Sequence, residues 1–165
     1  MKPRILAVLI AAALIVAGVF VYFEKPLAPE VRFTTLQGER FDTAALRGKV
    51  ALVNFWATTC TTCIEEMPDL VRTHEKFAAR GLETIAVAME YDPKEQVRAY
   101  VEKTALPFKV ALDTKGEVAL GFKGVRMTPT TFLIDRRGRI VLEYLGKPNF
   151  EELHARLEKL LAETA

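Results

Sequence analysis

The stretch of sequence that decides the fold is Val50–Pro68, which reads VALVNFWATTCTTCIEEMP. Its first six residues are apolar except for Asn54 and include β-branched side chains, so they predict a strand that is buried on both faces. Two cysteines follow, Cys60 and Cys63, and the residues after them predict a helix over 63–80. The segment therefore places a pair of thiols where a buried strand passes into a helix.

Strand and helix signals alternate on both sides of this segment. Apolar and β-branched runs predict strands over 31–36, 50–55, 82–89, 108–112, 130–134 and 139–145. Helices are predicted over 63–80, 93–104, 117–122 and 149–161. Asp92 and Asn149 stand at expected N-cap positions of two of these helices. A β-α-β start and a closing β-hairpin with a helix indicate the α/β class, with a mixed sheet covered by helices on both faces.

The N-terminal segment has the composition of a membrane anchor. Residues 5–23 carry no charge, and 19 helical residues span about 28 Å, close to the hydrocarbon core of a bilayer. A cleaved signal peptide is the alternative, although its apolar region is usually only about 7–15 residues long. Lys2 and Arg4 precede the run, so the positive-inside rule places the N-terminus in the cytoplasm. We therefore expect an anchor with a short tether over residues 1–27, and a domain over 28–165 outside a bacterial inner membrane, in the periplasm or an equivalent space, where disulfides persist.

The charge balance argues against polyanionic partners. The chain has 165 residues, with 23 Lys plus Arg against 21 Asp plus Glu. Two of the basic residues, Lys2 and Arg4, precede the apolar run, so the remainder is neutral. A neutral body has no basic footprint, and we expect no nucleic-acid partner and no binding to an anionic membrane surface.

The cysteine spacing predicts thiol chemistry. Cys60 and Cys63 are the two cysteines of the chain, and random placement would set two cysteines three apart in only about one case in eighty. The free N–H groups and positive dipole end of a helix favour an anion at Cys60. Cys63 lies one turn further along the same helix face, where we expect less exposure. Cys60 is therefore the expected nucleophile and Cys63 the thiol that resolves a mixed disulfide.

The cysteine pair has three other interpretations. A zinc site needs four ligands, but only His74 and His154 could join the two sulfurs, at spacings unlike those of a metal finger. A structural disulfide would close too short a loop to stabilise a domain of this size. The third alternative is a pair of inert buried thiols. We expect no metal and assign no role to the two histidines.

Three further strings complete a resemblance to a known family. GKVALVNFWA precedes the pair, CxxCxxEMP runs through Cys63, Glu66 and Pro68, and TPTTFLID occupies Thr128–Asp135. Together with the N-terminal anchor, they resemble the TlpA/ResA group of exported thiol-disulfide oxidoreductases in the thioredoxin superfamily. The resemblance implies a thioredoxin-like mixed sheet flanked by helices, with an inserted helix-strand unit at 93–112.

The resemblance also implies a substrate site. In this group the pair before TTFLID forms a cis X-Pro bond beside the disulfide, which maps to Thr128 and Pro129. Such a bond presents backbone groups to an extended substrate strand. Trp56 is the third expected substrate-binding residue, with packing in the core or rim as the alternative.

Two departures from the family pattern surround the first cysteine. Thr59 stands where the family usually has tryptophan, and Thr61-Thr62 stands where proline is frequent between the cysteines. A redox potential therefore does not carry over from the relatives.

A carboxylate completes the expected catalytic group. Glu66 follows Cys63 by three residues, so a helix places both on one face. In the resembled family a carboxylate here assists proton transfer to and from the cysteines, whereas the alternative is a solvated acid that suits the helix dipole. Asn54 occupies the strand position where thioredoxins often bury an acid, and its amide cannot act as a base. Glu65 is the residue expected in solvent.

The expected function is the reduction of disulfides in exported proteins, such as apo-cytochrome c or another metalloprotein precursor. A membrane electron donor would recharge the pair, and no cofactor is expected. A peroxiredoxin-like thiol peroxidase is the first alternative, but Val53 stands where a Pro-x-x-x-Thr-x-x-Cys string would have proline. A copper(I) carrier is the second, with Met67 and Met127 as the available additional ligands.

Overall fold

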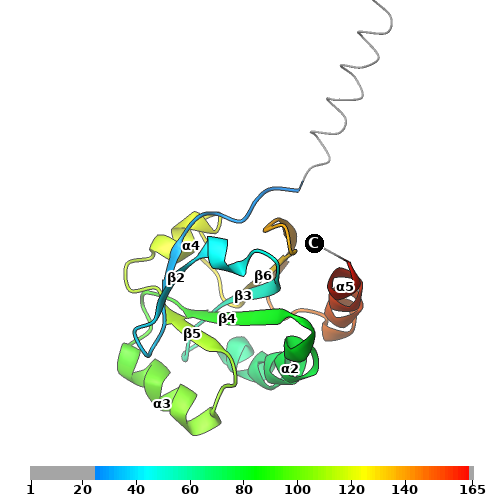
Figure 1. Ribbon diagram of the computed structural model, residues 1–165. Helices are drawn as coiled ribbons and strands as arrows, with labels where there is room; N and C mark the ends of the chain where they lie inside the picture. The colour runs from blue at the N-terminus through cyan, green and yellow to red at the C-terminus, as the bar shows by residue number, and fades with distance from the viewer. Residues whose placement is uncertain (1–24, 164–165) are drawn as a thin grey trace, which may run out of the picture.

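A five-stranded sheet forms the centre of the protein in the computed structural model, which describes residues 25–163 (Figure 1). Its order is β5-β4-β3-β6-β7, with β3, β4 and β5 parallel and β6 and β7 antiparallel to their neighbours. The strands are β3 (Val50–Trp56), β4 (Leu82–Ala88), β5 (Lys109–Leu112), β6 (Thr130–Ile134) and β7 (Ile140–Leu145). This confirms the predicted mixed sheet and puts the strand before the cysteines at its centre.

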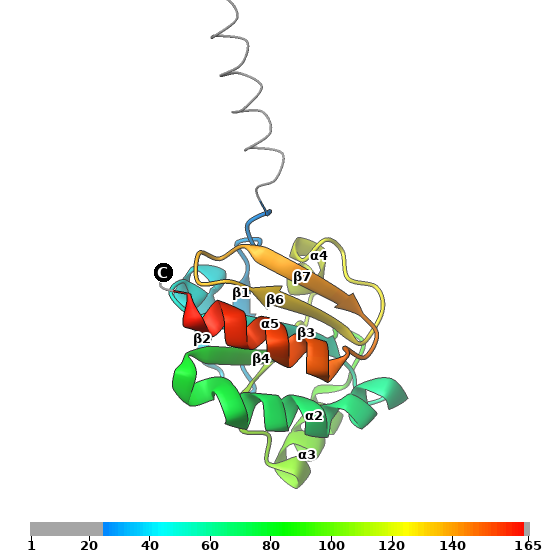
Figure 2. The same cartoon turned by 90° about the vertical axis from the view of Figure 1, so that its right-hand side faces the viewer.

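Helices and a hairpin cover the two faces of the sheet (Figures 1 and 2). The helices α2 (Thr61–Phe77), α3 (Lys94–Thr104) and α5 (Phe150–Ala162) pack on one face. The short helix α4 (Glu117–Gly121), the 3-10 turn η1 (Thr43–Leu46) and the hairpin of β1 (Arg32–Thr34) and β2 (Arg40–Asp42) pack on the other. A further 3-10 turn, η2 (Ala78–Arg80), continues α2. The predicted inserted unit forms α3 and the edge strand β5.

Alternation along β3 supplies both halves of the core. Val53 and Phe55 point to the hairpin face, where Phe55 packs edge-on against Phe122. Val50 and Leu52 point to the opposite face and join the cluster under α2 and α5. Because successive side chains of a strand point to opposite faces, a strand covered on both sides is apolar along its whole length.

The N-terminal hairpin differs from the single strand predicted over residues 31–36. Within the expected strand only Arg32–Thr34 pairs in a ladder, and a turn at Gly38 (φ 87°) leads into the antiparallel partner Arg40–Asp42. The second strand was missed because it has three residues and two of them are charged, which is typical of an edge and carries little period-2 signal.

The tether expected before the domain packs on the sheet. The Ile140 N–H donates to the Pro26 carbonyl at 2.8 Å, and the Ala28 N–H donates to Gly138 O at 2.8 Å. Residues 25–28 thus lie along the edge of β7. The predicted anchor at 5–23 lies outside the described residues, and within residues 25–163 no helix is both long enough and apolar enough to cross a bilayer.

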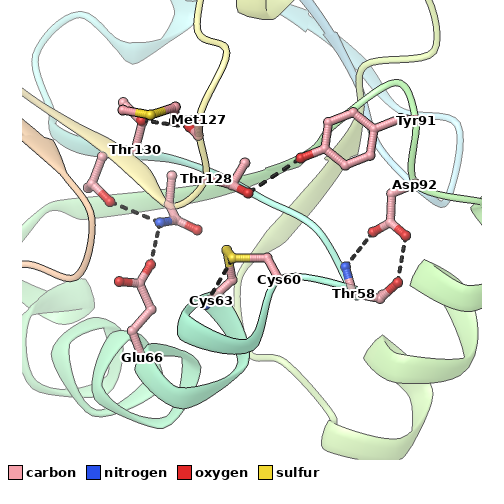
Figure 3. Close-up of a disulfide and its surroundings, with 11 residues drawn as sticks. Thr58, Cys60, Cys63, Glu66, Tyr91, Asp92, Met127, Thr128 and Thr130 are labelled. Atoms are coloured by element: carbon pink, nitrogen blue, oxygen red, sulfur yellow. Dashed lines mark hydrogen bonds between the residues drawn. A yellow bond between two sulfur atoms is a disulfide. The ribbon is translucent and has the colours of Figure 1, made fainter.

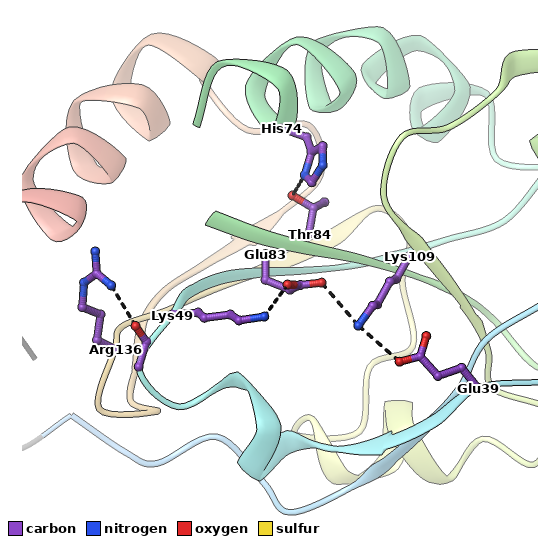
Figure 4. Close-up of polar contacts among 8 residues, drawn as sticks. Glu39, Lys49, His74, Glu83, Thr84, Lys109 and Arg136 are labelled. Atoms are coloured by element: carbon purple, nitrogen blue, oxygen red, sulfur yellow. Dashed lines mark hydrogen bonds and ion pairs between the residues drawn. The ribbon is translucent and has the colours of Figure 1, made fainter. Parts of the chain in front are cut away.

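A chain of ion pairs joins the hairpin region to the parallel strands (Figure 4). Glu83 on β4 contacts Lys49 at 2.9 Å and Lys109 at 3.6 Å, and Lys109 reaches Glu39 at 3.5 Å. Pairs that are this exposed typically contribute about 0–1 kcal/mol each. The network links surface side chains to one another. None of its described contacts involves a cysteine.

Candidate active site

Cys60 and Cys63 form a disulfide at the N-terminus of α2 (Figure 3). Cys60 is the N-cap residue, and its Sγ accepts a hydrogen bond from the Cys63 N–H at 3.2 Å. Cys60 is partly exposed, whereas Cys63 is fully buried. The predicted order of exposure is confirmed. The helix begins at Thr61, two residues earlier than predicted, so the whole pair lies within its first turn, where free N–H groups stabilise negative charge on sulfur.

Glu66 lies inside the protein, one turn after Cys63. Its side chain is fully buried, and its Oε1 accepts a hydrogen bond from Asn54 Nδ2 at 2.8 Å. The same Nδ2 donates to Thr131 Oγ1 on β6 at 2.9 Å. Within the described residues, Glu66 Oε2 and Asn54 Oδ1 have no hydrogen-bond partner. The solvated alternative therefore fails for Glu66, while Glu65 is exposed as predicted.

Burial changes the acidity of Glu66. Removal from water raises the pKa of its carboxyl from 4.5 to about 7, and the hydrogen bond from Asn54 opposes this shift only in part. Lys147 lowers the same pKa through its charge, and Asp69, which is paired with Lys147 at 3.1 Å, raises it. A carboxyl with a pKa near 7 exchanges protons readily at neutral pH, which is the property that a general acid or base requires.

The Thr128–Pro129 peptide bond is cis, as the resemblance implied. Thr128 is partly exposed and Pro129 is buried, with its carbonyl accepting from the Gly146 N–H at 2.8 Å. Among the described residues no backbone hydrogen bond involves Thr128. Figure 3 shows Thr128 on the loop that faces the disulfide, where its backbone groups are available to a second chain.

Trp56 does not contribute to the surface of the site. Its side chain is fully buried, with its ring centroid 5.2 Å from that of Tyr100 on α3. A substrate contact, expected from the sequence, is not possible for a side chain that offers no surface to a bound chain, and the packing alternative describes Trp56. The helix of the inserted unit covers it, which the local sequence around Trp56 does not encode.

Two exposed apolar side chains flank the site instead. Tyr91 is 56% exposed and Met127 is 62% exposed, and Figure 3 places them on either side of Thr128. The Tyr91 hydroxyl lies 3.3 Å from Thr128 Oγ1. Tyr91 could not be identified as a site residue from the sequence, because a lone tyrosine after a strand has no pattern that marks it.

Asp92 was expected to cap α3, and the structure corrects this. Pro93 is the N-cap residue of α3 and makes no side-chain cap hydrogen bond. The Asp92 carboxylate instead accepts hydrogen bonds from Thr58, which lies two residues before Cys60. The carboxylate therefore binds the loop before Cys60 and not the free N–H groups at the start of α3.

The two histidines lie away from the disulfide. His74 Nδ1 is 3.2 Å from Thr84 Oγ1, and His154 Nε2 is 2.8 Å from Thr73 Oγ1 (Figure 4 shows the former). Burial lowers the pKa of both rings. In the part of the chain that the structure describes, no three His, Cys, Asp or Glu side chains are grouped so that they could hold a metal ion.

Comparisons with known proteins agree with this geometry. A family model described as Redoxin matches residues 24–161. Thiol-disulfide oxidoreductase ResA of Bacillus thuringiensis (strain Al Hakam) is 35% identical over 133 residues, which are 81% of this chain and 76% of the relative. ResA of Geobacillus kaustophilus (strain HTA426) is 31% identical over 166 residues, covering 97% and 94% of the two chains.

Solved structures show the same likeness. A thiol:disulfide interchange protein of the thioredoxin family from Chlorobium tepidum TLS superimposes with a TM-score of 0.76 at 26% identity, covering 84% of this chain and 98% of that one. With its partly exposed Cys60, buried Cys63 and thioredoxin-like fold, the chain is a thiol-disulfide oxidoreductase and belongs to the Redoxin family.

Proposed function

We propose that the protein reduces disulfide bonds of exported proteins outside a bacterial inner membrane. The observation that carries the proposal is the difference in exposure between the two cysteines. Cys60 is accessible at the helix terminus, whereas Cys63 is buried one helical turn before Glu66. The reducing direction follows from the resemblance to the TlpA/ResA group, and the similarity to ResA proteins supports it.

The reaction conserves electrons through two exchanges. The Cys60 thiolate attacks one sulfur of a substrate disulfide, forms a mixed disulfide and releases the other sulfur as a thiolate, which takes a proton. Cys63 then loses its proton to the Glu66 carboxylate and attacks the Cys60 sulfur. The second substrate sulfur leaves as a thiolate and takes the proton held by Glu66, and the protein ends in the oxidised state seen here. Substrate gains two electrons and two protons, and a membrane dithiol donor returns them to the pair by the reverse exchange.

The substrate would bind as an extended segment beside the disulfide. Thr128 offers a backbone N–H and C=O with no backbone partner among the described residues, and β-strand addition uses such groups. Exposed Tyr91 and Met127 supply apolar contact on either side. This arrangement favours an unfolded or flexible substrate, such as apo-cytochrome c or another metalloprotein precursor.

The location rests on the N-terminal segment. Residues 5–23 carry no charge, and the alignment with ResA of Geobacillus kaustophilus covers 97% of this chain, so most of that segment has a counterpart in the relative. We expect carbonate-washed membranes to retain the full-length chain. Recovery of a soluble form that begins near Pro29 would show a cleaved signal instead.

Trapping in cells tests the proposal. A Cys63→Ala variant should accumulate mixed disulfides with exported proteins through Cys60, while the Cys60→Ala/Cys63→Ala double variant accumulates none. Acid quenching followed by alkylation should find the parental pair mainly reduced in cells. If the pair is mainly oxidised and its deletion leaves exported thiols unpaired, the protein is an oxidant and the proposed direction is wrong.

A further inference from the structure

Asp92 binds the backbone segment that delivers Cys60. Its Oδ2 accepts from the Thr58 N–H at 2.6 Å, and its Oδ1 accepts from the Thr58 hydroxyl at 2.5 Å (Figure 3). Asp92 is only 7% exposed. Hydrogen bonds to an ionised carboxylate are stronger than neutral ones, and two of them to one residue hold both its backbone and its side chain.

Thr58 belongs to the turn between β3 and α2. Within that turn the Cys60 N–H donates to Ala57 O at 3.1 Å, so Thr58 lies inside the loop that ends at the nucleophile. Residues 57–60 are outside the strand ladder, and the sheet does not hold them directly. The position of Cys60 therefore depends on contacts that restrain this turn.

The loop that carries Asp92 is itself held on a second side. Tyr91 precedes Asp92, and its hydroxyl lies 3.3 Å from Thr128 Oγ1. Consecutive residues thus contact the two segments between which a substrate disulfide must fit. Thr58 and Asp92 are 34 positions apart, and no helix or strand contains both of them.

We propose that Asp92 is a positioning residue for Cys60. It acts through Thr58 and holds the turn so that the thiolate is presented to a substrate disulfide in one geometry. This proposal concerns the thiol-disulfide exchange itself and holds whichever exported protein is the substrate. It predicts that Asp92 affects the reactivity of the Cys60 thiolate more than a purely structural contact would.

The charge of Asp92 and its hydrogen bonds have different kinetic signatures. A nearby carboxylate opposes formation of a thiolate, so its loss lowers the pH midpoint of reactivity. Loss of positioning instead lowers the rate at the alkaline plateau, where every Cys60 is already a thiolate. Asparagine separates the two effects, because its Oδ1 accepts from the Thr58 N–H and its Nδ2 donates to Thr58 Oγ1. The Thr58 hydroxyl proton then turns to Gln96 Oε1, which lies 3.3 Å away.

The experiment measures attack by Cys60 on a small aromatic disulfide, 5,5′-dithiobis(2-nitrobenzoate), across the pH range up to the plateau. The purified full-length chain with Cys63→Ala is the parent, so only one thiol reacts. Asp92→Ala should lower the plateau rate by about tenfold, and Asp92→Asn should recover most of it. Glu95→Ala, which removes an exposed carboxylate of the same helix start, should keep the parental plateau.

The outcomes separate positioning from structure and from charge. A parental plateau rate in Asp92→Ala, even with a lower melting temperature, would overturn the proposal. Equal slowing of the plateau rate in Asp92→Ala and Asp92→Asn would also overturn it, because asparagine keeps the hydrogen bonds to Thr58 and should therefore keep the position of Cys60. If Asp92→Ala does not fold, Thr58→Val decides: a plateau rate about two- to threefold below the parent supports positioning, and a parental rate contradicts it.

Discussion

Cys60 and Cys63 are three residues apart, yet they lie in opposite environments. Cys60 caps the helix and is partly exposed. Cys63 is sealed in the interior on the helix face that also carries buried Glu66. The surface half of the site is suited to meeting another protein, and the buried half is suited to moving a proton where water does not compete.

The two halves also differ in how well their polar groups are satisfied. The Asp92 carboxylate accepts two hydrogen bonds from Thr58, whereas Glu66 Oε2 has no partner within the described residues. A buried carboxyl with an oxygen that lacks a hydrogen-bond partner destabilises a fold, and it does so more when the group is ionised. In the surface half, hydrogen bonds fix the position of the turn before Cys60. In the buried half, the unpartnered Glu66 carboxyl lowers stability, and its role in proton transfer explains why it is there.

The largest effect on the rate of disulfide reduction should come from replacing the cysteine sulfur in each half of the site by oxygen. Cys60→Ser replaces a thiolate by a hydroxyl that does not ionise near neutral pH, so reduction of a peptide disulfide should fall by at least about 10³-fold. Cys63→Ser should still release the first substrate thiol and then stop as a mixed disulfide. Single-turnover release of thiol measures both. Attack by Cys60→Ser with none by Cys63→Ser would reverse the assigned roles.

The buried half should make stability depend on pH. In the oxidised protein Glu66 has a pKa of about 7 against 4.5 for the free group, so the native state holds the extra proton between these values. The contribution of Glu66 to stability should therefore be fully present below about pH 4.5 and be lost as pH rises to about 7. Relative to the parent, Glu66→Gln should gain up to about 3 kcal/mol over this interval.

Chemical denaturation of both proteins at a series of pH values gives this difference directly. Glu65→Gln is the matched control, because Glu65 is exposed in the same helical turn. A constant difference between Glu66→Gln and the parent across the interval would mean that Glu66 titrates normally.

A third prediction concerns the buried half of the site. Loss of the Glu66 carboxyl should slow the resolution of the mixed disulfide, by less than the loss of the Cys60 thiol slows substrate reduction. Without an ionisable group at 66, Cys63 must lose its proton to solvent, so decay of the mixed disulfide near neutral pH should slow by about 10- to 100-fold. The pH profile should lose its inflection near 7. Stopped-flow measurement with a peptide disulfide tests this, with Glu65→Gln expected at the parental rate. A parental profile in Glu66→Gln would end the proton-relay interpretation.

The smallest expected effect is the difference between the alkylation rates of the two thiols. In the reduced protein at neutral pH, iodoacetamide should label Cys60 about tenfold faster than Cys63, because only Cys60 reaches the surface. Peptide mass spectrometry after timed quenching measures the ratio. Faster labelling of Cys63 would show that the reduced state does not keep the environments seen here.

Local patterns in the sequence determined much of the protein. The buried central strand, the helix after it and the more exposed position of Cys60 follow from residue type and helical spacing. The N-cap at Asn149 was also predictable, since its side chain accepts from Glu152 three residues later at 3.1 Å. These features depend on neighbours in the chain, and the period of a helix or strand translates spacing directly into direction.

Only the tertiary structure decided how deep each side chain lies and which distant group it meets. Helical spacing placed Glu66 on the face of Cys63, but burial in the packed interior raised its pKa, and the hydrogen bond from Asn54 on β3 offset that rise only in part. Trp56 is buried beneath α3, where its ring packs against Tyr100. The Asp92 carboxylate accepts hydrogen bonds from Thr58 and does not cap α3. A periodic pattern indicates a direction, whereas burial and partners depend on elements that meet only when the chain has packed.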